Sequence, residues 1–291
     1  MQSPRPEVWL RAALARVDPV SANGLIDRLV TEKMLVPWSL GARLVDLHLR
    51  TTVASEWAAV SPAVETSRIL REAQCAGAIS LPAPAPAHID LMAVLNARRS
   101  CRAFHDAPMR LSQFATLLAC GVGLGSDPEP PAPLVPGGPV GRRTYPSGGG
   151  LYAVETLVYP LRVEDVSAGF YSYQALAHRI VPVAAPRPAD DLVVLLGNHP
   201  IEHASVIVCL FVDFARPSLG KYGEKAYRLA LLEAGHMAQN VVLVATGLGY
   251  AALPICGFDD AALSRAAALS FPHEAIVYVL ALGAPAHGAD A

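Results

Sequence analysis

Basic and hydroxyl side chains that could bind a phosphate group cluster in one short segment, Arg98-Arg99-Ser100-Cys101-Arg102. Arg98, Ser100 and Arg102 recur at every second position, so two guanidinium groups and one hydroxyl can converge on a single phosphate. Guanidinium groups bind phosphate oxygens in pairs, and the hydroxyl adds a hydrogen bond. We call residues 98–102 the arginine segment. Taken by itself, it is equally typical of an arginine-rich surface patch.

A second segment, Pro146-Ser147-Gly148-Gly149-Gly150, is suited to close contact with a ligand. Consecutive glycines let the backbone approach a ligand and expose N–H groups to it. We call residues 146–150 the glycine turn. No Gly-Lys-Ser/Thr follows it and the G-x-G-x-x-G order is absent, which excludes a P-loop and a dinucleotide-binding fingerprint. An ordinary turn would have the same composition.

Lys221 and Tyr222 are adjacent and could supply a base and a proton carrier. Burial lowers the pKa of a lysine and allows it to accept a proton near neutral pH; a solvated pair ahead of a helix is the alternative. Further along, Glu233 could form a buried ion pair or assist catalysis. His236 lies among small residues, which favours a structural, hydrogen-bonded histidine over a catalytic one.

Mixed helices and strands are predicted around these segments. Apolar periodicity predicts a long helix, and continuous β-branched runs predict buried strands. The order of elements indicates an α+β or α/β sandwich. The expected elements are a helical start becoming a strand at 151–163, a hairpin strand at 169–173, strands at 204–211 and 275–282, a helix at 225–246, and a helix end, strand and glycine turn at 247–257.

Three regions are predicted along the chain. Residues 1–79 carry helical patterns such as the one at Leu25, Ile26 and Leu29, and indicate an N-terminal helical, winged-helix-like module. This module has no basic recognition helix, which favours packing or protein contact over DNA binding. Residues 80–88 form a Pro/Ala-rich linker and 89–291 the main domain. The Pro- and Gly-rich stretch 126–141 is interpreted as a flap over a site.

Composition excludes several functional classes. A formal net charge of −2 gives no electrostatic footprint for nucleic acid and no basic membrane anchor. Glycines and Pro254 interrupt the most apolar stretch, 241–258, before it reaches the roughly 20 residues of a membrane span. Charged residues near the N-terminus argue against a signal peptide, so we expect a cytoplasmic protein with no membrane partner. The five cysteines lack metal-ligand spacing and are expected to be ordinary buried thiols, with no metal site.

In this order, RRSCRAF, PSGGGLY, KYGEKAYR, LLEAGHMAQN and GLGYAALPICGF resemble the flavin-dependent nitroreductase superfamily over about residues 90–285. The resemblance is to its SagB-type or McbC-like branch, whose members often carry a helical domain ahead of the flavin fold. It implies an α+β, nitroreductase-like, FMN-binding homodimer with one FMN in each of two sites at the subunit interface.

The resemblance also implies which residues contact the cofactor. It assigns Arg98, Ser100 and Arg102 to the phosphate and ribityl chain. It places Pro146, Ser147 and Gly148 along the isoalloxazine, and Pro254, Ile255 and Gly257 on its other side. Asn240 and Gln239 are candidates for contact with flavin or the partner subunit. Many relatives end with basic residues that reach the phosphate, whereas this chain does not, so Arg142, Arg143 or Arg98 must supply that charge.

The Lys-Tyr pair narrows the implied reaction, because SagB-type azoline dehydrogenases carry such a pair and general nitroreductases do not. The implied activity is oxidation of thiazoline or oxazoline to thiazole or oxazole in peptide natural-product biosynthesis, with Lys221 as base and Tyr222 as relay or orienting group. The substrate would be a ribosomal peptide, made with a cyclodehydratase partner, or a carrier-bound heterocycle. An NAD(P)H-dependent nitro or quinone reductase and a non-catalytic scaffold subunit are the alternatives.

Overall fold

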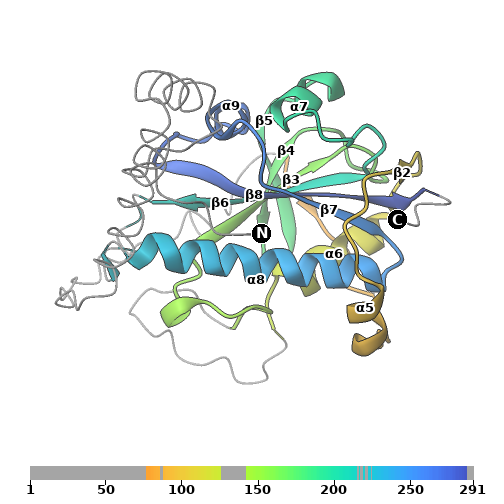
Figure 1. Ribbon diagram of the computed structural model, residues 1–291, viewed down its shortest axis with the longest axis horizontal. Helices are drawn as coiled ribbons and strands as arrows, with labels where there is room; N and C mark the ends of the chain where they lie inside the picture. Colours follow the sequence, from red (N-terminus) through yellow and green to blue (C-terminus); the bar gives the residue numbers. More distant parts are fainter. Residues whose placement is uncertain are drawn as a thin grey trace, which may run out of the picture. The chain divides into compact units, whose positions relative to one another are not determined.

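A computed structural model describes residues 77–85, 88–125, 142–214, 216, 219, 222–223 and 225–286 of the chain. One β-sheet lies between two layers of helices (Figure 1). Helices α6 (Leu111–Val122) and α8 (Lys225–Gly247) cover one face, and α7 (Ala189–Leu195) and α9 (Asp260–Ala266) cover the other. The short helix α5 (Leu91–Ala97) contacts α8.

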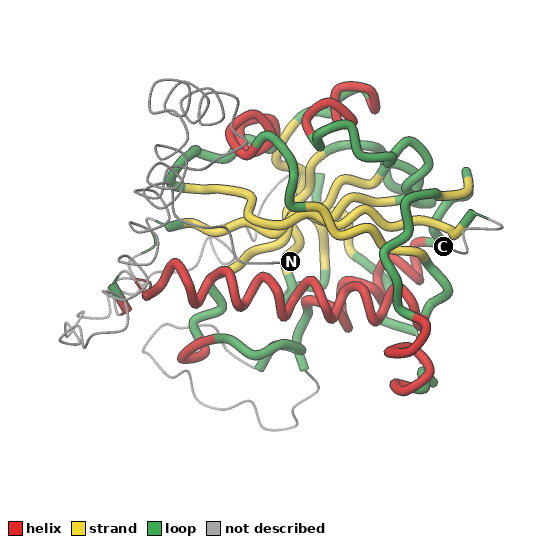
Figure 2. Tube along the Cα trace, viewed as in Figure 1, coloured by secondary structure: helices red, strands yellow, loops and turns green. Residues whose placement is uncertain are grey.

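The sheet has eight strands, and all its strand pairs are antiparallel. Its order is β1-β5-β4-β3-β6-β8-β2, and β7 also pairs with β8; the strands gather at the centre of the tube drawing (Figure 2). Their bounds are β1 (Ile79–Ser80), β2 (Phe104–His105), β3 (Val154–Pro160), β4 (Phe170–Gln174), β5 (Arg179–Ala184), β6 (Val206–Asp213), β7 (Ala251–Ile255) and β8 (Glu274–Pro285).

Strand β6 shows why the central strands are apolar on both faces. Every residue from Val206 to Val212 is buried, because helices cover the sheet above and below. Alternate side chains enter two separate cores. Val208 and Leu210 pack in the core under α6 and α8, while Ile207 and Cys209 pack in the core under α7 and α9.

Helix α8 is the main support of the candidate site. Its buried face is built mainly from small residues, which let it lie close to the sheet and to α6: a Cβ on Gly121 would meet Val241 at 3.0 Å. The helix is long and apolar enough to span a membrane by length and composition. Its alanine-rich face nevertheless packs against the sheet and α6, as in a core helix.

The predicted fold class is confirmed, as are the strands within 204–211 and 275–282 and the helix at 225–246. The expected helical start at 151 is wrong: a short 3-10 turn, η1 (Gly148–Gly150), precedes β3 instead. Strand β1 lies at the boundary of the predicted linker and pairs with β5. The N-terminal module and the 126–141 flap lie outside the described residues, so the three-region division stays a prediction.

The expectation of buried thiols is right for two of the four described cysteines. Cys101 and Cys209 are buried, but Cys120 and Cys256 are exposed. Cys256 follows the last residue of β7, where the chain leaves the sheet, and Cys120 faces outward near the end of α6. Among the described residues, no group of three His, Cys, Asp or Glu side chains could hold a metal ion.

Candidate functional site

The arginine segment runs beside strand β7. Ser100 forms a parallel bridge with Ala252, and the N–H of Cys101 donates to the carbonyl of Ala252 at 2.9 Å. Arg98 caps the C-terminal end of α5 and is half-buried, whereas Ser100 and Arg102 are exposed. Two predicted cofactor segments far apart in the sequence, 98–102 and 251–257, are thus brought together.

Within the second of these segments, Pro254 and Ile255 end strand β7 and Gly257 follows in an exposed loop. The end of α7 closes on this loop, and the N–H of Asp259 donates to Leu195 O at 3.1 Å. Gly197 adopts a φ of +66° there, and a Cβ on it would collide with the carbonyl oxygen of Gly257. A glycine at 197 is therefore required for this approach.

The glycine turn is anchored to α8 by a buried carboxyl group. The Ser147 hydroxyl donates to Glu233 and accepts the N–H of Tyr152 at 2.8 Å. The second carboxyl oxygen of Glu233 accepts the N–H of Val154 at 2.9 Å. Glu233 therefore holds both ends of the chain that leads from the turn into β3. Among the described residues it does so by hydrogen bonds, without the ion pair considered above.

Tyr222 lies directly over the glycine turn. A Cβ placed on Gly149, which has a φ of +66°, would collide with the Tyr222 hydroxyl. The Tyr222 phenol thus occupies the space that a side chain at position 149 would fill. Lys221 lies outside the described residues.

Two further side chains of α8 contact the chain just before the turn and at its first residue. The Asn240 amide donates to the carbonyl of Thr144 at 2.9 Å, so Asn240 contacts its own chain in this structure. His236 Nδ1 lies 3.3 Å from the carbonyl oxygen of Pro146, which is the structural hydrogen bond predicted for this histidine. Both contacts add to the attachment made by Glu233.

Unpartnered polar atoms lie beside the turn. Arg143 Nε and Thr144 Oγ1 are buried without a hydrogen-bond partner in the part of the chain that the structure describes. The Arg143 guanidinium lies 5.7 Å from the centre of the Tyr152 ring. Buried polar groups are normally satisfied, so these two atoms indicate a position where a ligand or a second chain can supply partners.

Burial raises the pKa of Glu233, although its hydrogen bonds from Ser147 and Val154 and the nearby Arg216 and Arg143 lower it in part. Only 3% of the residue is exposed. The carboxyl group therefore stays protonated to a higher pH than an exposed glutamate does.

The raised pKa predicts how stability depends on pH. A folded-state pKa above the unfolded one contributes stability that is full below the unfolded pKa and is lost as the pH rises through the folded pKa. Urea unfolding of the wild type and Glu233→Gln across pH 4 to 8 should therefore show the wild type losing free energy of unfolding relative to the variant as the pH rises. A difference that is constant with pH would contradict this assignment.

The predicted residues form two groups at different ends of α8 (Figure 1). The arginine segment follows α5, where Ile89 packs against Gly247 at the helix C-terminus. The glycine turn contacts Leu229 and Glu233 in the N-terminal half. From Glu233 to Gly247 the helix rises about 20 Å, at about 1.5 Å per residue. One chain therefore does not bring its two groups together.

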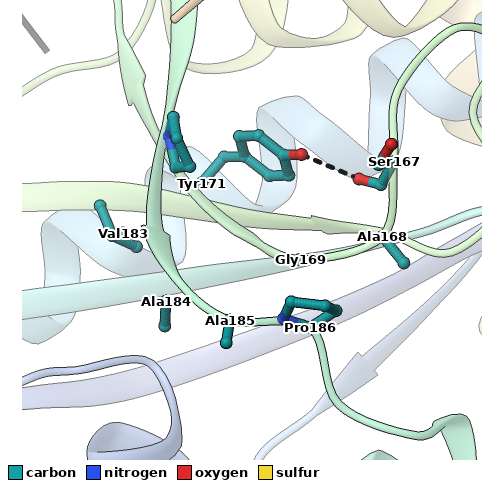
Figure 3. Close-up of a pocket in the computed structure, with 9 residues that line it drawn as sticks. Ser167, Ala168, Gly169, Tyr171, Val183, Ala184, Ala185 and Pro186 are labelled. Carbon is teal, nitrogen blue, oxygen red and sulfur yellow. Dashed lines mark hydrogen bonds between the residues drawn. The ribbon is translucent and has the colours of Figure 1, made fainter. Parts of the chain in front are cut away.

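A cavity of about 530 Å³ lies elsewhere, between the turn before β4 and the end of β5 (Figure 3). Ser167, Gly169, Tyr171 and Pro186 are among its lining residues, and the Tyr171 hydroxyl donates to the carbonyl of Ser167 at 3.0 Å. It contains none of the predicted site residues, and we do not assign the reaction to it.

Sequence reasoning missed the contacts that hold the site together. Ser147 and Glu233 are 86 residues apart, and Thr144 and Asn240 are 96 apart, so no local pattern links them. The available signal for Glu233 was a charged residue on the buried face of a helix, which requires a partner. Gly197 carried no signal beyond its residue type.

Comparisons with known proteins agree on one protein family. A family model described as "Nitroreductase family" matches residues 95–284. The "Putative nitroreductase MJ1384" of Methanocaldococcus jannaschii is 29% identical over 173 residues, which are 59% of this chain and 81% of that protein. The "Microcin B17-processing protein McbC" of Escherichia coli is 33% identical over 132 residues, 43% of this chain and 47% of McbC. The match to McbC thus spans about half of its length.

Solved structures agree in fold. A protein from Ralstonia eutropha JMP134 that also carries the name nitroreductase superposes with a TM-score of 0.57 at 22% identity, covering 72% of this chain and 90% of that one. A chain of the E. coli microcin synthetase McbBCD complex with truncated pro-MccB17 bound superposes with a TM-score of 0.53 at 23% identity, covering 88% and 96%. At these identities the similarity shows the fold alone.

Proposed function

The chain belongs to the nitroreductase family, and on that premise we propose that it is an FMN-dependent dehydrogenase of peptide natural-product biosynthesis. Its substrate is a thiazoline or oxazoline, and its product is the thiazole or oxazole. The observation that carries the proposal is the position of the Tyr222 hydroxyl over Gly149 of the glycine turn, next in sequence to Lys221. The similarity to McbC supports a peptide-bound heterocycle as the substrate.

The side chains present fit FMN. Two arginines and a serine at alternate positions beside β7 match a phosphate group, which guanidinium groups bind in pairs. The unpartnered Arg143 Nε and Thr144 Oγ1 next to the glycine turn can be satisfied by a polar ring edge. Arg98, Ser100 and Arg102 would hold the phosphate and ribityl chain. Pro146, Ser147 and Gly148 would lie along one side of the isoalloxazine. The opposite side would be contacted by Pro254, Ile255 and Gly257.

A homodimer would complete this site. The arginine segment and the glycine turn lie at different ends of α8, so a second copy is needed to bring its turn to the first copy's arginine segment. Large apolar side chains are exposed on the two helices that flank these groups, as expected of a subunit interface. They are Leu91, Met92 and Leu95 on α5 and Tyr227, Leu231 and Leu232 on α8.

In the proposed reaction, Lys221 accepts the acidic ring proton of the azoline, and the Tyr222 hydroxyl orients the ring or relays that proton. FMN, when bound, would supply the acceptor for the hydride, with oxygen as the final electron acceptor. The glycine turn leaves room for the phenol, and Glu233 holds the turn in place. The proposed enzyme is cytoplasmic and acts on a peptide together with a cyclodehydratase partner. Its net charge of −2 gives no electrostatic footprint for nucleic acid or membrane.

A nitro or quinone reductase that uses NAD(P)H is the second candidate, and the similarity to MJ1384 along most of that protein favours it. The two activities differ in what reduces the flavin. An azoline dehydrogenase takes electrons from its substrate, whereas a reductase takes them from NAD(P)H.

One experiment separates the candidates. The purified full-length protein should be yellow, elute as a dimer, and convert an azoline-containing peptide to the azole with a mass loss of about 2 Da per ring, since two hydrogen atoms leave the ring. Under anaerobic conditions, the azoline peptide should bleach the flavin absorbance and NADH or NADPH should not. Rapid bleaching by NAD(P)H without azoline oxidation would instead establish the reductase. A protein that stays colourless after reconstitution with FMN would indicate a scaffold subunit.

A further inference from the structure

Glu233 is an unusual residue for the buried face of a helix. It is 3% exposed and lies among alanines and Met237 on the face of α8 that packs against the core. A buried carboxyl group is costly unless its oxygens are hydrogen-bonded. Here each oxygen accepts one bond, from the Ser147 hydroxyl and from the Val154 N–H. Both donors belong to the chain that carries the glycine turn into β3.

The glycine turn connects Ser147 to the proposed catalytic tyrosine, Tyr222. The Ser147 hydroxyl also accepts the N–H of Tyr152, which closes the chain around Gly149. The Tyr222 hydroxyl lies against Gly149, in the space that a side chain at this position would occupy. The contacts therefore run from Glu233 to Ser147, from Ser147 to the turn, and from the turn to Tyr222.

We propose that Glu233 is a positioning residue, which acts through Ser147 to fix the glycine turn and thereby the Tyr222 hydroxyl. The role of Tyr222 rests on the proposed function, whereas the attachment of the turn to Glu233 does not. Glu233 is 3% exposed and both its carboxyl oxygens bond to its own chain, so the role assigned to it is to act through Ser147. Its effect is on the geometry of the turn and of the phenol, where small displacements reduce rates strongly.

Variants at Glu233, Met237 and Ser147 test the proposal in the full-length, FMN-loaded protein. Glu233→Ala removes both acceptors. Glu233→Gln preserves them in altered form, because its oxygen can accept the Val154 N–H while its amide donates to the Ser147 oxygen. Met237→Ala is the matched control, since it opens a cavity one turn further along the buried face of α8 and removes none of the described hydrogen bonds that hold the glycine turn.

Hydrogen exchange followed by mass spectrometry reads the turn directly. In Glu233→Ala, protection of the amides in residues 147–154 and at Tyr222 should be lost, while Glu233→Gln and Met237→Ala should keep it. Ser147→Ala should lose the same protection, and combining it with Glu233→Ala should add little, because the two residues act as one unit. Normal protection in Glu233→Ala would overturn the proposal.

Turnover of the azoline peptide measures how the variants affect the proposed function of Tyr222. The kcat of Glu233→Ala should fall about tenfold or more with KM little changed, as expected when geometry at the reacting atoms is disturbed. Glu233→Gln should recover most of the kcat. An equal loss in Met237→Ala would reduce the role of Glu233 to general stability and overturn the proposal. A wild type that oxidises no azoline would refute the proposed function, and the exchange experiment would still decide whether Glu233 fixes the turn and Tyr222.

Discussion

Replacing Lys221 with alanine is expected to lower the rate of azoline oxidation by about 10²- to 10⁴-fold, the usual range for removing a general base. FMN should stay bound, because the side chains proposed to bind its phosphate lie in the arginine segment and not beside Tyr222. The measurement is steady-state turnover of an azoline peptide, with the flavin content read from the absorbance spectrum of the same sample.

Lys225→Ala is the matched control for this variant. Lys225 begins α8 four residues later and is half-buried, so the change removes one positive charge from the same part of the chain. It should leave turnover near that of the wild type. Normal turnover in Lys221→Ala, or an equal loss in Lys225→Ala, would remove Lys221 as the base.

Gly149→Ala is expected to lower kcat about 10- to 100-fold, because the new methyl group would collide with the Tyr222 hydroxyl and displace it. The φ of +66° adds a backbone cost of about 1–2 kcal/mol for a residue with a side chain. Turnover and thermal unfolding, measured together, separate the displacement of the phenol from the loss of stability.

Gly249→Ala provides the comparison. Gly249 also has a positive φ, +83°, but a Cβ there would meet nothing within 4 Å. The two variants should therefore lose similar stability, and only Gly149→Ala should lose turnover. Equal turnover in both would show that the position of the phenol over the turn has no role in the reaction.

Local sequence patterns predicted the elements of the fold more reliably than their pairing. The continuous apolar runs in β6 and β8 correctly indicated strands covered on both faces. Such runs are most common in parallel sheets, yet both strands pair antiparallel here. Burial on both faces sets the composition of a strand, whereas the direction of its neighbour depends on connections that the run itself does not encode.

The candidate site was predictable as a set of segments but not as a geometry. Ser147 could be assigned to the glycine turn, yet its hydroxyl is directed to Glu233 on a helix 86 residues later. The exposed Cys256 illustrates the same limit, because its burial depends on where β7 leaves the sheet. Residue type and spacing record local chemistry, while the partner of a polar group is fixed by packing between distant elements.

The placement of the arginine segment and the glycine turn at different ends of α8 has a genetic consequence in the dimer that we propose. Each chain then contributes its arginine segment to one site and its glycine turn with Tyr222 to the other. Consider a chain defective at Arg98 mixed with a chain defective at Tyr222. In the mixed dimer, one site collects both lesions and the other contains neither. Two inactive alleles would thus complement each other within a single protein molecule, whereas two alleles damaged in the same half would not.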